Sequence, residues 1–384
     1  MTVLICGGGV IGACIAYFLS LRGIEAVVVE RAGVANAASG KSGGFLARDW
    51  CDGTPVAALA RRGFDLHAEL AQNPERDWGY RRVGALGVVA REGQDVSRFG
   101  RLAPPDWLAA DCAVHGRLST ADTTAQIHPA AFTAAMMAGA TERGARLVEG
   151  CVQGLALSPD GKRAAGAVID DTKLAADAVV IAMGPWSLLA CRWLPLPAVF
   201  GVKAHSLVFD YEPSPESLFA DVETEGGEEA HPEFYPRPDG TTYVCGSSGE
   251  QGLPVDPADV AAEPDAVARL KRLTACVSPD LAASSVLAEQ ACFRPVTADG
   301  LPLIGAVPGI AGAFVATGHS VWGMLNGPST AEAMAELIVD GAARTVDLRP
   351  FDPARLDPLD PEVLRARAAP QSGRGMVQTS ATVT

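Results

Sequence analysis

Residues Val3 to Glu30 read VLICGGGVIGACIAYFLSLRGIEAVVVE, a pattern typical of a strand, a tight turn, a helix and a second strand. An apolar run at Val3 to Ile5 ends at glycines, a helical pattern follows from about Val10 to Leu21, and a second apolar run ends at Glu30. Together they form a βαβ unit of about 30 residues, the size expected of a dinucleotide-binding unit. The chain is therefore predicted to contain a Rossmann-type domain.

The glycines of the turn match the pattern G-x-G-x-x-G at Gly7, Gly9 and Gly12. Gly7 lets the strand turn, Gly9 lets the backbone approach a pyrophosphate, and Gly12 lets the helix pack closely on the strand. The phosphates would lie at the positive end of the helix. A carboxylate at Glu30 suits the ribose hydroxyls and repels a 2′-phosphate, which favours FAD or NAD over NADP. A glycine turn with a purely structural role is the alternative interpretation.

The length, composition and net charge of the chain exclude several classes of protein. A chain of 384 residues exceeds one ordinary hydrophobic core and predicts two domains. A hydrophobic fraction of 48% with 20% charged residues is typical of a globular protein. The net charge of −14 is not offset by any basic run, so neither a nucleic acid nor an anionic membrane is expected as a partner.

The cysteines and the apolar segments indicate the compartment in which the protein is expected. The apolar N-terminus lacks a basic region and contains three consecutive glycines, so we expect neither a signal peptide nor a membrane span there. No other stretch reaches the roughly eighteen apolar residues that a span requires. The nine cysteines are scattered without a C-x-x-C pair. They indicate buried thiols in a reducing cytoplasm, and neither a disulfide framework nor a metal site.

Small residues dominate the segment from Ala35 to Gly44, which follows Glu30. It could be a surface loop. Because only Gly, Ala and Ser let a backbone lie close against a flat ligand, we favour a loop that contacts the cofactor.

The remaining chain alternates between helical and strand-like patterns. A turn at Asp160–Gly161 predicts a hairpin, and Ala178 to Gly184 has the pattern of a buried strand. The regions 82–127 and 198–290 are rich in predicted strands, and an acidic, proline-rich loop is expected at Asp221 to Pro238. The chain from Ala369 onward is expected to be unstructured. Helices are predicted at Thr54–Ala71, Pro129–Arg143, Pro264–Val277 and Met324–Val339.

Five segments together resemble the D-amino-acid-oxidase-like family of FAD-dependent oxidoreductases, which includes glycine and sarcosine oxidases. They are VLICGGGVIG…VVVE, AASGKSGGF, VVIAMGPWS, YPRPDGTTYVCG, and CFRPVTADGLPLIG followed by ATGHSVWGMLNGPSTAEAMAELI. The resemblance covers about residues 1–345. It implies an α/β fold with a Rossmann-type FAD-binding domain (1–80, 128–197 and 291–345) and a substrate domain on a large mixed β-sheet (81–127 and 198–290). Residues 346–384 would be a partly disordered C-terminal extension.

The resemblance also implies which residues contact FAD. They would hold the pyrophosphate, the adenosine ribose and the flavin, and the helix that follows GHSVWG would place its positive end near the flavin pyrimidine ring. The implied cofactor-binding residues are Gly7, Gly9, Val10, Ile11, Gly12, Glu30, Arg31, Ala38, Ser39, Ser42, Gly43, Gly44, Val152, Gly184, Trp186, Gly318, Trp322, Gly323, Met324 and Leu325.

Three residues are candidates for roles in catalysis. Arg294 matches the arginine that pairs with the substrate carboxylate in amino-acid-oxidising members, although an interdomain ion pair is the alternative. His319 has either a chemical role or a helix-capping role, and Tyr235 lies either at the mouth of the pocket or in the core. Cys292 aligns with the region in which sarcosine-oxidase-like members carry a flavin-bonding cysteine; we favour non-covalent FAD, because cysteine is often buried for packing alone.

Two positions depart from the family pattern. Monomeric sarcosine oxidases carry a lysine that helps to activate oxygen in the strand matching TTYVCG, where the alignment places Val244. Glycine-oxidase-like members have a second arginine in the segment matching GHSVWG, where this chain has Val321. Slow reoxidation by oxygen is therefore expected, and Lys203 and Lys41 are the cations that could substitute.

The sequence as a whole predicts an enzyme that oxidises the C–N bond of an amino acid or secondary amine to an imine by hydride transfer to FAD. Two alternatives remain open: an NAD-dependent dehydrogenase, and a flavin-binding assembly or scaffold protein in which FAD is structural. The substrate would be a small amine or amino acid. Its identity, the electron acceptor and the oligomeric state are not determined by the sequence.

Overall fold

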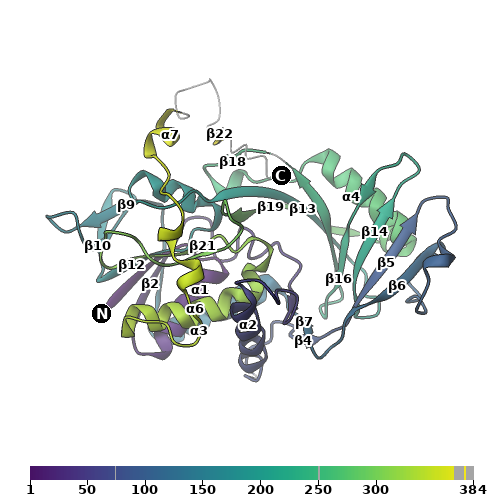
Figure 1. The fold of residues 1–384 in the computed structure, drawn as a ribbon, viewed down its shortest axis with the longest axis horizontal. Coiled ribbons are helices and arrows are strands. Elements are labelled where there is room, and N and C mark those ends of the chain that lie inside the picture. Colours follow the sequence, from purple (N-terminus) through teal and green to yellow (C-terminus); the bar gives the residue numbers. More distant parts are fainter. Residues whose placement is uncertain (74, 250, 367–375, 378–384) are drawn as a thin grey trace.

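The computed structural model describes residues 1–73, 75–249, 251–366 and 376–377. The molecule is elongated and has two lobes (Figure 1). The first lobe contains both the start and the end of the described chain, and the second lobe is dominated by a curved β-sheet with one long helix on its outer face. The two lobes meet beside the loops that connect the strands of the first lobe to its helices.

The first sheet gives the first lobe its α/β character. Among the described residues it has the strand order β20-β21-β12-β1-β2-β8, in which β20 alone is antiparallel to its neighbour. Its strands come from the start, the middle and the end of the chain, so three distant segments share one hydrogen-bonded layer. The bounds are β1 Thr2–Cys6, β2 Glu25–Glu30, β8 Arg146–Glu149, β12 Ala178–Ile181, β20 Leu303–Ala306 and β21 Ala313–Thr317.

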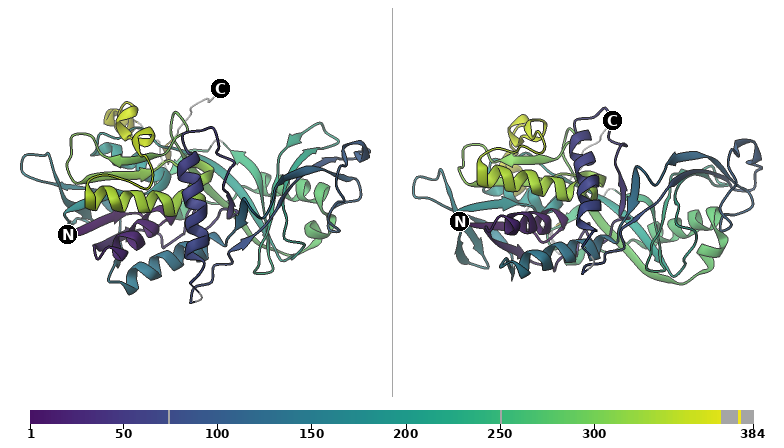
Figure 2. Two further views of the ribbon diagram at one scale, coloured as in Figure 1. Left: turned by 60° about the horizontal axis from the view of Figure 1, so that its bottom comes forward. Right: turned by 90° about the horizontal axis from the view of Figure 1, so that it is seen from below.

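Helices α1 (Val10–Leu21), α3 (Pro129–Glu142) and α6 (Gly323–Asp340) cover one face of the first sheet (Figure 1). Figure 2 shows α2 (Ala57–Leu70) at the junction of the lobes, packed against α6. The other face is covered by a smaller sheet of β9 (Val152–Leu157), β10 (Ala164–Ile169) and β11 (Thr172–Ala175), together with a 3-10 helix, η2, at Gly184–Arg192. Apolar side chains fill both faces, as expected for strands buried on both sides.

The second sheet builds the second lobe. Its strand order is β19-β13-β17-β16-β14-β5-β6, with β15 paired to β14, and the β14–β5 pair is parallel in an otherwise antiparallel arrangement. Helix α4 (Pro264–Val277) and the short α5 (Pro279–Ala283) pack on the outer face. The bounds are β5 Ala85–Arg91, β6 Cys112–Ser119, β13 Phe200–Phe209, β14 Ser217–Glu223, β15 Glu229–Ala230, β16 Glu233–Pro236, β17 Thr242–Gly249 and β19 Val286–Val296.

Short strands complete the chain. β3 (Phe45–Ala47), β4 (Arg81–Arg82) and β7 (Thr124–Gln126) form a small sheet near the junction of the lobes, and β18 (Leu253–Pro254) pairs with β22 (Met376–Val377). A short α7 spans Pro361–Ala366. In the part of the chain that the structure describes, no helix combines the length and apolar character needed to cross a bilayer.

Most predicted elements are confirmed with small shifts at their ends. The hairpin turns where predicted, between β9 and β10, and α4 has the predicted bounds, while α2 is shorter at its start and α6 begins one residue earlier. The mixed sheet implied by the resemblance is also confirmed. The predicted loop at Asp221 to Pro238 is wrong, because this segment contains the end of β14 and all of β15 and β16. The predicted unstructured tail from Ala369 lies outside the described residues except for Met376 and Val377.

The sheets cross the domain boundaries that the resemblance implies. β19 runs from Val286 to Val296 without interruption, so it passes through the boundary at residues 290 and 291 while staying in the second sheet. The segment 81–127 also divides, because β5 and β6 join the second sheet while β4 and β7 pair with β3. The proposed division into an FAD-binding and a substrate domain therefore has strands that belong to neither part alone.

Candidate functional site

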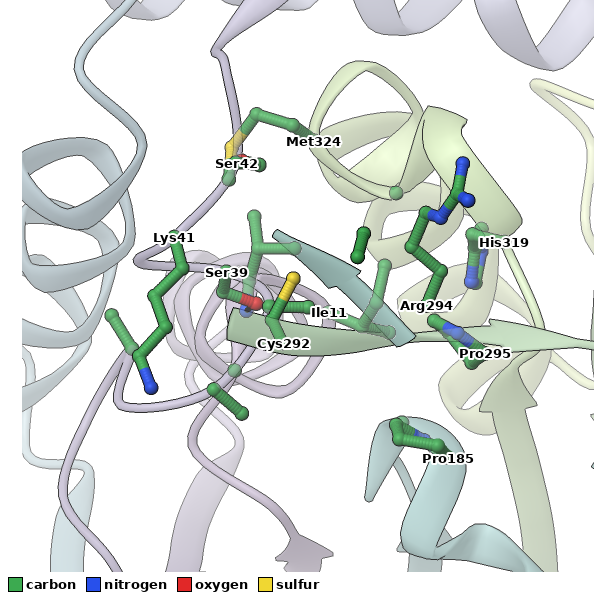
Figure 3. Close-up of a pocket in the computed structure, with 18 of the residues that line it drawn as sticks. Ile11, Ser39, Lys41, Ser42, Pro185, Cys292, Arg294, Pro295, His319 and Met324 are labelled. Atoms are coloured by element: carbon green, nitrogen blue, oxygen red, sulfur yellow. Dashed lines mark hydrogen bonds between the residues drawn. The ribbon is translucent and has the colours of Figure 1, made fainter. Parts of the chain in front are cut away.

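A cavity of about 570 Å³ lies where the two lobes meet (Figure 3). Its walls include the loops after β1, β2, β12 and β21 and the side chains on the inner face of the second sheet. In open α/β sheets, ligands bind in the crevice outside the carboxyl ends of the strands, and this cavity has that position. We take it as the candidate active site.

The glycines of the first turn divide into two kinds. Gly7 has a φ of 111°, and a Cβ there would lie 2.4 Å from the carbonyl oxygen of Ala182. A Cβ on Gly12 would lie 1.9 Å from the carbonyl oxygen of Gly7, and Gly12 does not line the cavity. Gly7 and Gly9 both line the cavity, as do Val10 and Ile11. Gly7 and Gly12 thus permit the turn and the packing of α1, whereas Gly9 leaves space for a ligand.

Glu30 lines the cavity with its carboxylate already held in place. Oε2 accepts a hydrogen bond from the Gly8 N–H at 2.7 Å, and Oε1 accepts one from the Ala32 N–H at 2.8 Å. The neighbouring Arg31 also lines the cavity, and its Nη2 donates to Asp256 Oδ2 at 3.0 Å. A carboxylate oriented by two backbone donors is suited to accept further hydrogen bonds from ribose hydroxyls.

The loop from Ala38 to Gly44 follows the cavity wall, and Ala38, Ser39, Ser42, Gly43 and Gly44 all line it. Ser39 Oγ accepts a hydrogen bond from the Val10 N–H at 2.9 Å. A Cβ on Gly43 would lie 2.5 Å from the Tyr235 ring, and one on Gly44 would lie 2.0 Å from the carbonyl oxygen of Ile127. The small residues are thus required by the surrounding protein as well as by any ligand.

The segments after β12 and β21 line the cavity in part. Gly184 and Trp186 follow β12 and lie in its wall, as does Val152 at the start of β9; Trp186 Nε1 donates to the Pro254 carbonyl at 2.8 Å. At the start of α6, Trp322, Gly323 and Met324 also line it.

Two further cofactor-contact predictions are not supported by position. Leu325 is only 1% exposed and packs in the core of the first lobe. Gly318 has a φ of 81°, and a Cβ there would lie 2.8 Å from Thr297 Cγ2, so this glycine is explained by the turn that precedes η4 (Ser320–Trp322). Neither residue lines the cavity.

Arg294 extends from β19 into the cavity wall (Figure 3). Its Nη2 donates to Ser248 Oγ at 3.0 Å, while its Nε is buried without a hydrogen-bond partner. Among the described residues, no carboxylate pairs with this guanidinium, so the predicted alternative of an interdomain ion pair is not supported. A guanidinium that lines a cavity without a carboxylate partner is a binding group for an anion.

His319 and Tyr235 also line the cavity, but neither is a free acid or base. His319 is 3% exposed, its Nε2 lies 3.0 Å from Thr330 Oγ1, and burial lowers its pKa to about 3. Its side chain caps neither η4 nor α6, so the helix-capping alternative is not supported. Tyr235 Oη donates to Glu233 Oε2 at 2.6 Å, and burial raises the Tyr235 pKa. At neutral pH the site therefore offers a neutral imidazole and a protonated phenol.

The buried histidines predict a loss of stability in acid. The ordinary histidine pKa is 6.5, whereas burial lowers the pKa of His67 to about 4 and that of His319 to about 3. Below pH 6.5 the unfolded chain binds protons that the folded protein excludes. The free energy of unfolding should therefore fall as the pH is lowered from 6.5 towards 4, by up to about 1.4 kcal/mol per pH unit for each histidine.

Urea denaturation at several pH values within this window measures the slope. His67→Gln should make the free energy of unfolding depend less steeply on pH, because a glutamine side chain does not titrate between pH 6.5 and 4. The matched control is His115→Gln, at an exposed histidine of β6. Equal slopes in wild type and His67→Gln would contradict the prediction.

Val244 lies away from the cavity. Its side chain is fully buried on the outer face of the second sheet, where it packs with Leu270 of α4, and it does not line the cavity. Its neighbours Tyr243 and Cys245 face the cavity instead, because side chains alternate along a strand. Lys203 does not line the cavity either; its Nζ is held by Glu263 Oε1 and Gln251 Oε1, each at 2.7 Å. Lys41 does line it.

Several lining residues were not predicted from the sequence. The alternation along β17 identifies Tyr243 and Cys245 once the facing side is known, but the sequence does not indicate that side. Nothing in the sequence marks Trp50 or Phe219, which reach the cavity from different lobes. Among the described residues, no three His, Cys, Asp or Glu side chains are grouped as a metal site requires.

Comparison with known proteins identifies the family. A model of the family described as FAD dependent oxidoreductase matches residues 2–337. Glycine oxidase of Pseudomonas putida is 28% identical, over 91% of this chain and 98% of that protein, and an uncharacterized oxidoreductase of Bacillus subtilis is 26% identical over the same shares. The crystal structure of glycine oxidase from Geobacillus kaustophilus has a TM-score of 0.75 and 26% identity, covering 92% of this chain and 98% of that one. The resemblance inferred from the sequence is thereby confirmed: this chain belongs to the family of FAD-dependent oxidoreductases.

Proposed function

We propose that this protein oxidises the C–N bond of an amino acid or secondary amine to an imine, with FAD as the acceptor of the hydride. The observation that carries the proposal is Arg294, a guanidinium in the cavity wall with a buried, unpaired Nε and without an ion-pair partner among the described residues. A planar guanidinium binds a carboxylate through two parallel hydrogen bonds. A substrate carboxylate would supply the missing partner.

The residues of the first lobe fit FAD. Gly9 lines the cavity beside the N-terminus of α1, Glu30 presents a fixed carboxylate, and Gly184 has open space where a Cβ would stand. We propose that these residues hold the pyrophosphate, the ribose and the flavin in that order. The start of α6, with Gly323 and Met324, would lie at the flavin pyrimidine ring. When bound, FAD supplies the two-electron acceptor for the reaction.

The protein contributes binding and orientation. Arg294 holds the substrate carboxylate, which fixes the α-carbon relative to the cofactor. The α-carbon loses a hydride, the nitrogen lone pair forms the C=N bond, and the proton on nitrogen leaves to water; water then hydrolyses the released imine. His319 remains neutral because burial holds its pKa near 3, so it contributes a polar wall without a competing charge.

The sequence left two alternatives to this function, an NAD-dependent dehydrogenase and a flavin-binding scaffold. Membership of an FAD-dependent family removes the NAD-dependent dehydrogenase. The scaffold alternative is tested by adding a panel of amines and amino acids anaerobically and recording the bleaching of the flavin absorbance. We expect carboxylated amines to bleach it. If none does, FAD serves a structural purpose and the proposed reaction is wrong.

We predict that FAD is bound without a covalent link. Cys292 lines the cavity, but burial raises the pKa of its thiol, which disfavours the reactive thiolate. Acid precipitation should leave the pellet colourless and the supernatant fluorescent. A yellow pellet in wild type that becomes colourless in Cys292→Ser would contradict the prediction. Cys276→Ser, at a thiol outside the cavity, is the matched control.

Lys41 is the proposed cation for reaction with oxygen. The expectation of slow reoxidation depended on Val244, which does not face the cavity, whereas Lys41 does and Arg31 is paired with Asp256. A nearby positive charge stabilises a developing superoxide. Lys41→Met should slow reoxidation in air by about tenfold or more, an effect of the size seen when one electrostatic donor is removed.

The anaerobic reduction of Lys41→Met by substrate should remain normal, as measured by stopped-flow absorbance. Lys173→Met, at an exposed residue of β11, should leave both steps unchanged. Unchanged reoxidation in Lys41→Met would exclude this role and leave the physiological electron acceptor open.

We also propose the cytoplasm as the location of the protein. All nine cysteines are free thiols, and six of them are buried. This usage suits a reducing compartment.

A further inference from the structure

The end of the cavity under β16 and β14 is lined by aromatic rings. Phe45, Trp50, Phe219 and Tyr235, here called the aromatic group, all line the cavity, and their ring centroids lie 4.9–5.9 Å from one another in the contacting pairs. They come from both lobes, since Phe45 and Trp50 follow the glycine-rich loop while Phe219 and Tyr235 belong to the second sheet. The rings pack against one another as a cluster, and a ring face that is turned to the cavity attracts a cation.

Glu233 lies in the wall beside the aromatic group. Its Oε2 accepts hydrogen bonds from Tyr235 Oη at 2.6 Å and from Cys245 Sγ at 3.5 Å. Among the described residues, no lysine, arginine or histidine forms an ion pair with this carboxylate. The other cavity carboxylate, Glu30, lies in the first lobe and accepts a backbone N–H at each oxygen, whereas Glu233 accepts its hydrogen bonds at Oε2 alone. Glu233 is thus a negative charge, held in position, with one oxygen available to a ligand.

Arg294 and Glu233 lie on the same inner face of the second sheet but not side by side. The strand order β19-β13-β17-β16 places three strand spacings of about 4.8 Å each between their backbones. The Arg294 side chain crosses part of this distance, because its Nη2 reaches Ser248 on β17. The two residues are also offset along the strands, because Arg294 pairs with Val202 whereas Glu233 lies in line with Ser206 through Cys245. The roof of the cavity therefore presents a positive group and a negative group at two separate places.

From this arrangement we infer a second binding subsite, in which Glu233 and the aromatic group hold a cationic group at the end of the substrate remote from its carboxylate. The substrate would be an amino or imino acid with a distal ammonium or N-alkylated ammonium. The inference rests on the proposed function for the placement of the carboxylate at Arg294. It adds the chemical class of the other end of the substrate.

The test measures binding without turnover. Isothermal titration calorimetry of the FAD-loaded protein compares 6-aminohexanoate, which has a carboxylate and a distal ammonium but no α-amine, with hexanoate, which lacks the ammonium. Wild type should bind 6-aminohexanoate about tenfold or more tightly, the usual gain for a charge-assisted hydrogen bond. In Glu233→Gln this preference should disappear while the affinity for hexanoate stays the same.

Control variants separate the subsite from a change in fold. Glu233→Gln keeps an oxygen that can accept the Tyr235 hydrogen bond, so its melting temperature should match wild type. Glu229→Gln, at an exposed residue of β15 outside the cavity, should keep the preference. The inference would be overturned if wild type bound both ligands with equal affinity or bound neither. It would also be overturned if Glu233→Gln lost affinity for 6-aminohexanoate and for hexanoate to the same extent.

Flavin bleaching by lysine and by norleucine distinguishes this inference from the proposed function. If norleucine and lysine reduce the flavin equally well, C–N oxidation stands and the cation subsite fails. If no member of the panel of amines and amino acids reduces the flavin but Glu233 controls the binding preference, the subsite stands and the proposed reaction fails.

Discussion

Gly9→Leu is expected to give a folded protein that is purified without flavin. Gly9 lines the cavity at the N-terminus of α1, and a Cβ there would meet only the Ser39 Oγ, at 3.0 Å. The rest of a leucine side chain would occupy the space in which the pyrophosphate lies against the helix N-terminus. The visible absorbance per protein should fall to near zero, whereas the far-ultraviolet circular dichroism should match that of wild-type apoprotein.

Gly12→Ala should fail in a different way. Its Cβ would lie 1.9 Å from the carbonyl oxygen of Gly7, so α1 would have to move away from β1. Overpacking of this kind costs about 3 kcal/mol or more, a large part of the stability of an ordinary domain. Urea denaturation of the apoprotein should show this loss in Gly12→Ala but not in Gly9→Leu.

Gly154→Leu is the matched control for both variants. It places a side chain in β9 where nothing lies within 4 Å of the added Cβ, and it should retain both flavin and stability. If Gly9→Leu retains stoichiometric FAD, the pyrophosphate does not lie at this turn. If Gly12→Ala is as stable as wild type, the division of the glycines into packing and ligand-facing kinds is wrong.

The sequence predicted what depends on local spacing. The first βαβ unit, the hairpin of β9 and β10, and α4 follow from periodicity and turn residues within short windows, and all are confirmed. The glycine fingerprint identified Gly9 and Glu30, and the family resemblance identified Arg294; all three line the cavity. Their roles stay predictions.

The sequence did not predict the residues whose place in the site depends on which side of a strand faces the ligand. A shift of one residue along β17 exchanges Val244 for Tyr243 or Cys245, because successive side chains point to opposite faces. The alignment offered no means to choose between them. Glu233 was assigned to a loop, because the short β16 is surrounded by acidic residues and prolines that read as a turn. Pairing with β14 and β17, which are distant in sequence, makes it a strand.

Arg294→Ala is expected to weaken transition-state binding of a carboxylated substrate by about 2–5 kcal/mol, the usual result of removing one member of a buried charge pair. The substrate carboxylate must leave water to enter the cavity, and that step is tolerable only with a charged, fixed partner. Stopped-flow reduction at several substrate concentrations gives the relevant ratio of rate constant to dissociation constant. FAD content and melting temperature should change little, because the guanidinium bonds only Ser248 among the described residues.

Arg294→Lys should recover only part of this loss, because an ammonium cannot form the two parallel hydrogen bonds of a guanidinium. Amines without a carboxylate should react equally well with wild type and both variants. Arg101→Ala removes an exposed arginine of the second lobe that does not line the cavity, and it should leave the reduction unchanged.

The combination of these results separates an enzyme from a scaffold. A loss confined to carboxylated substrates places the carboxylate at Arg294, and the chemistry then lies next to it. If the reduction by the best carboxylated substrate survives Arg294→Ala nearly intact, a plain amine becomes the better substrate class and the arginine needs another explanation. If instead the variant unfolds while no substrate reduces the wild-type flavin, Arg294 is a structural residue. The buried, unpaired Nε argues against that last outcome, because a structural arginine is expected to have its donors satisfied by the protein itself.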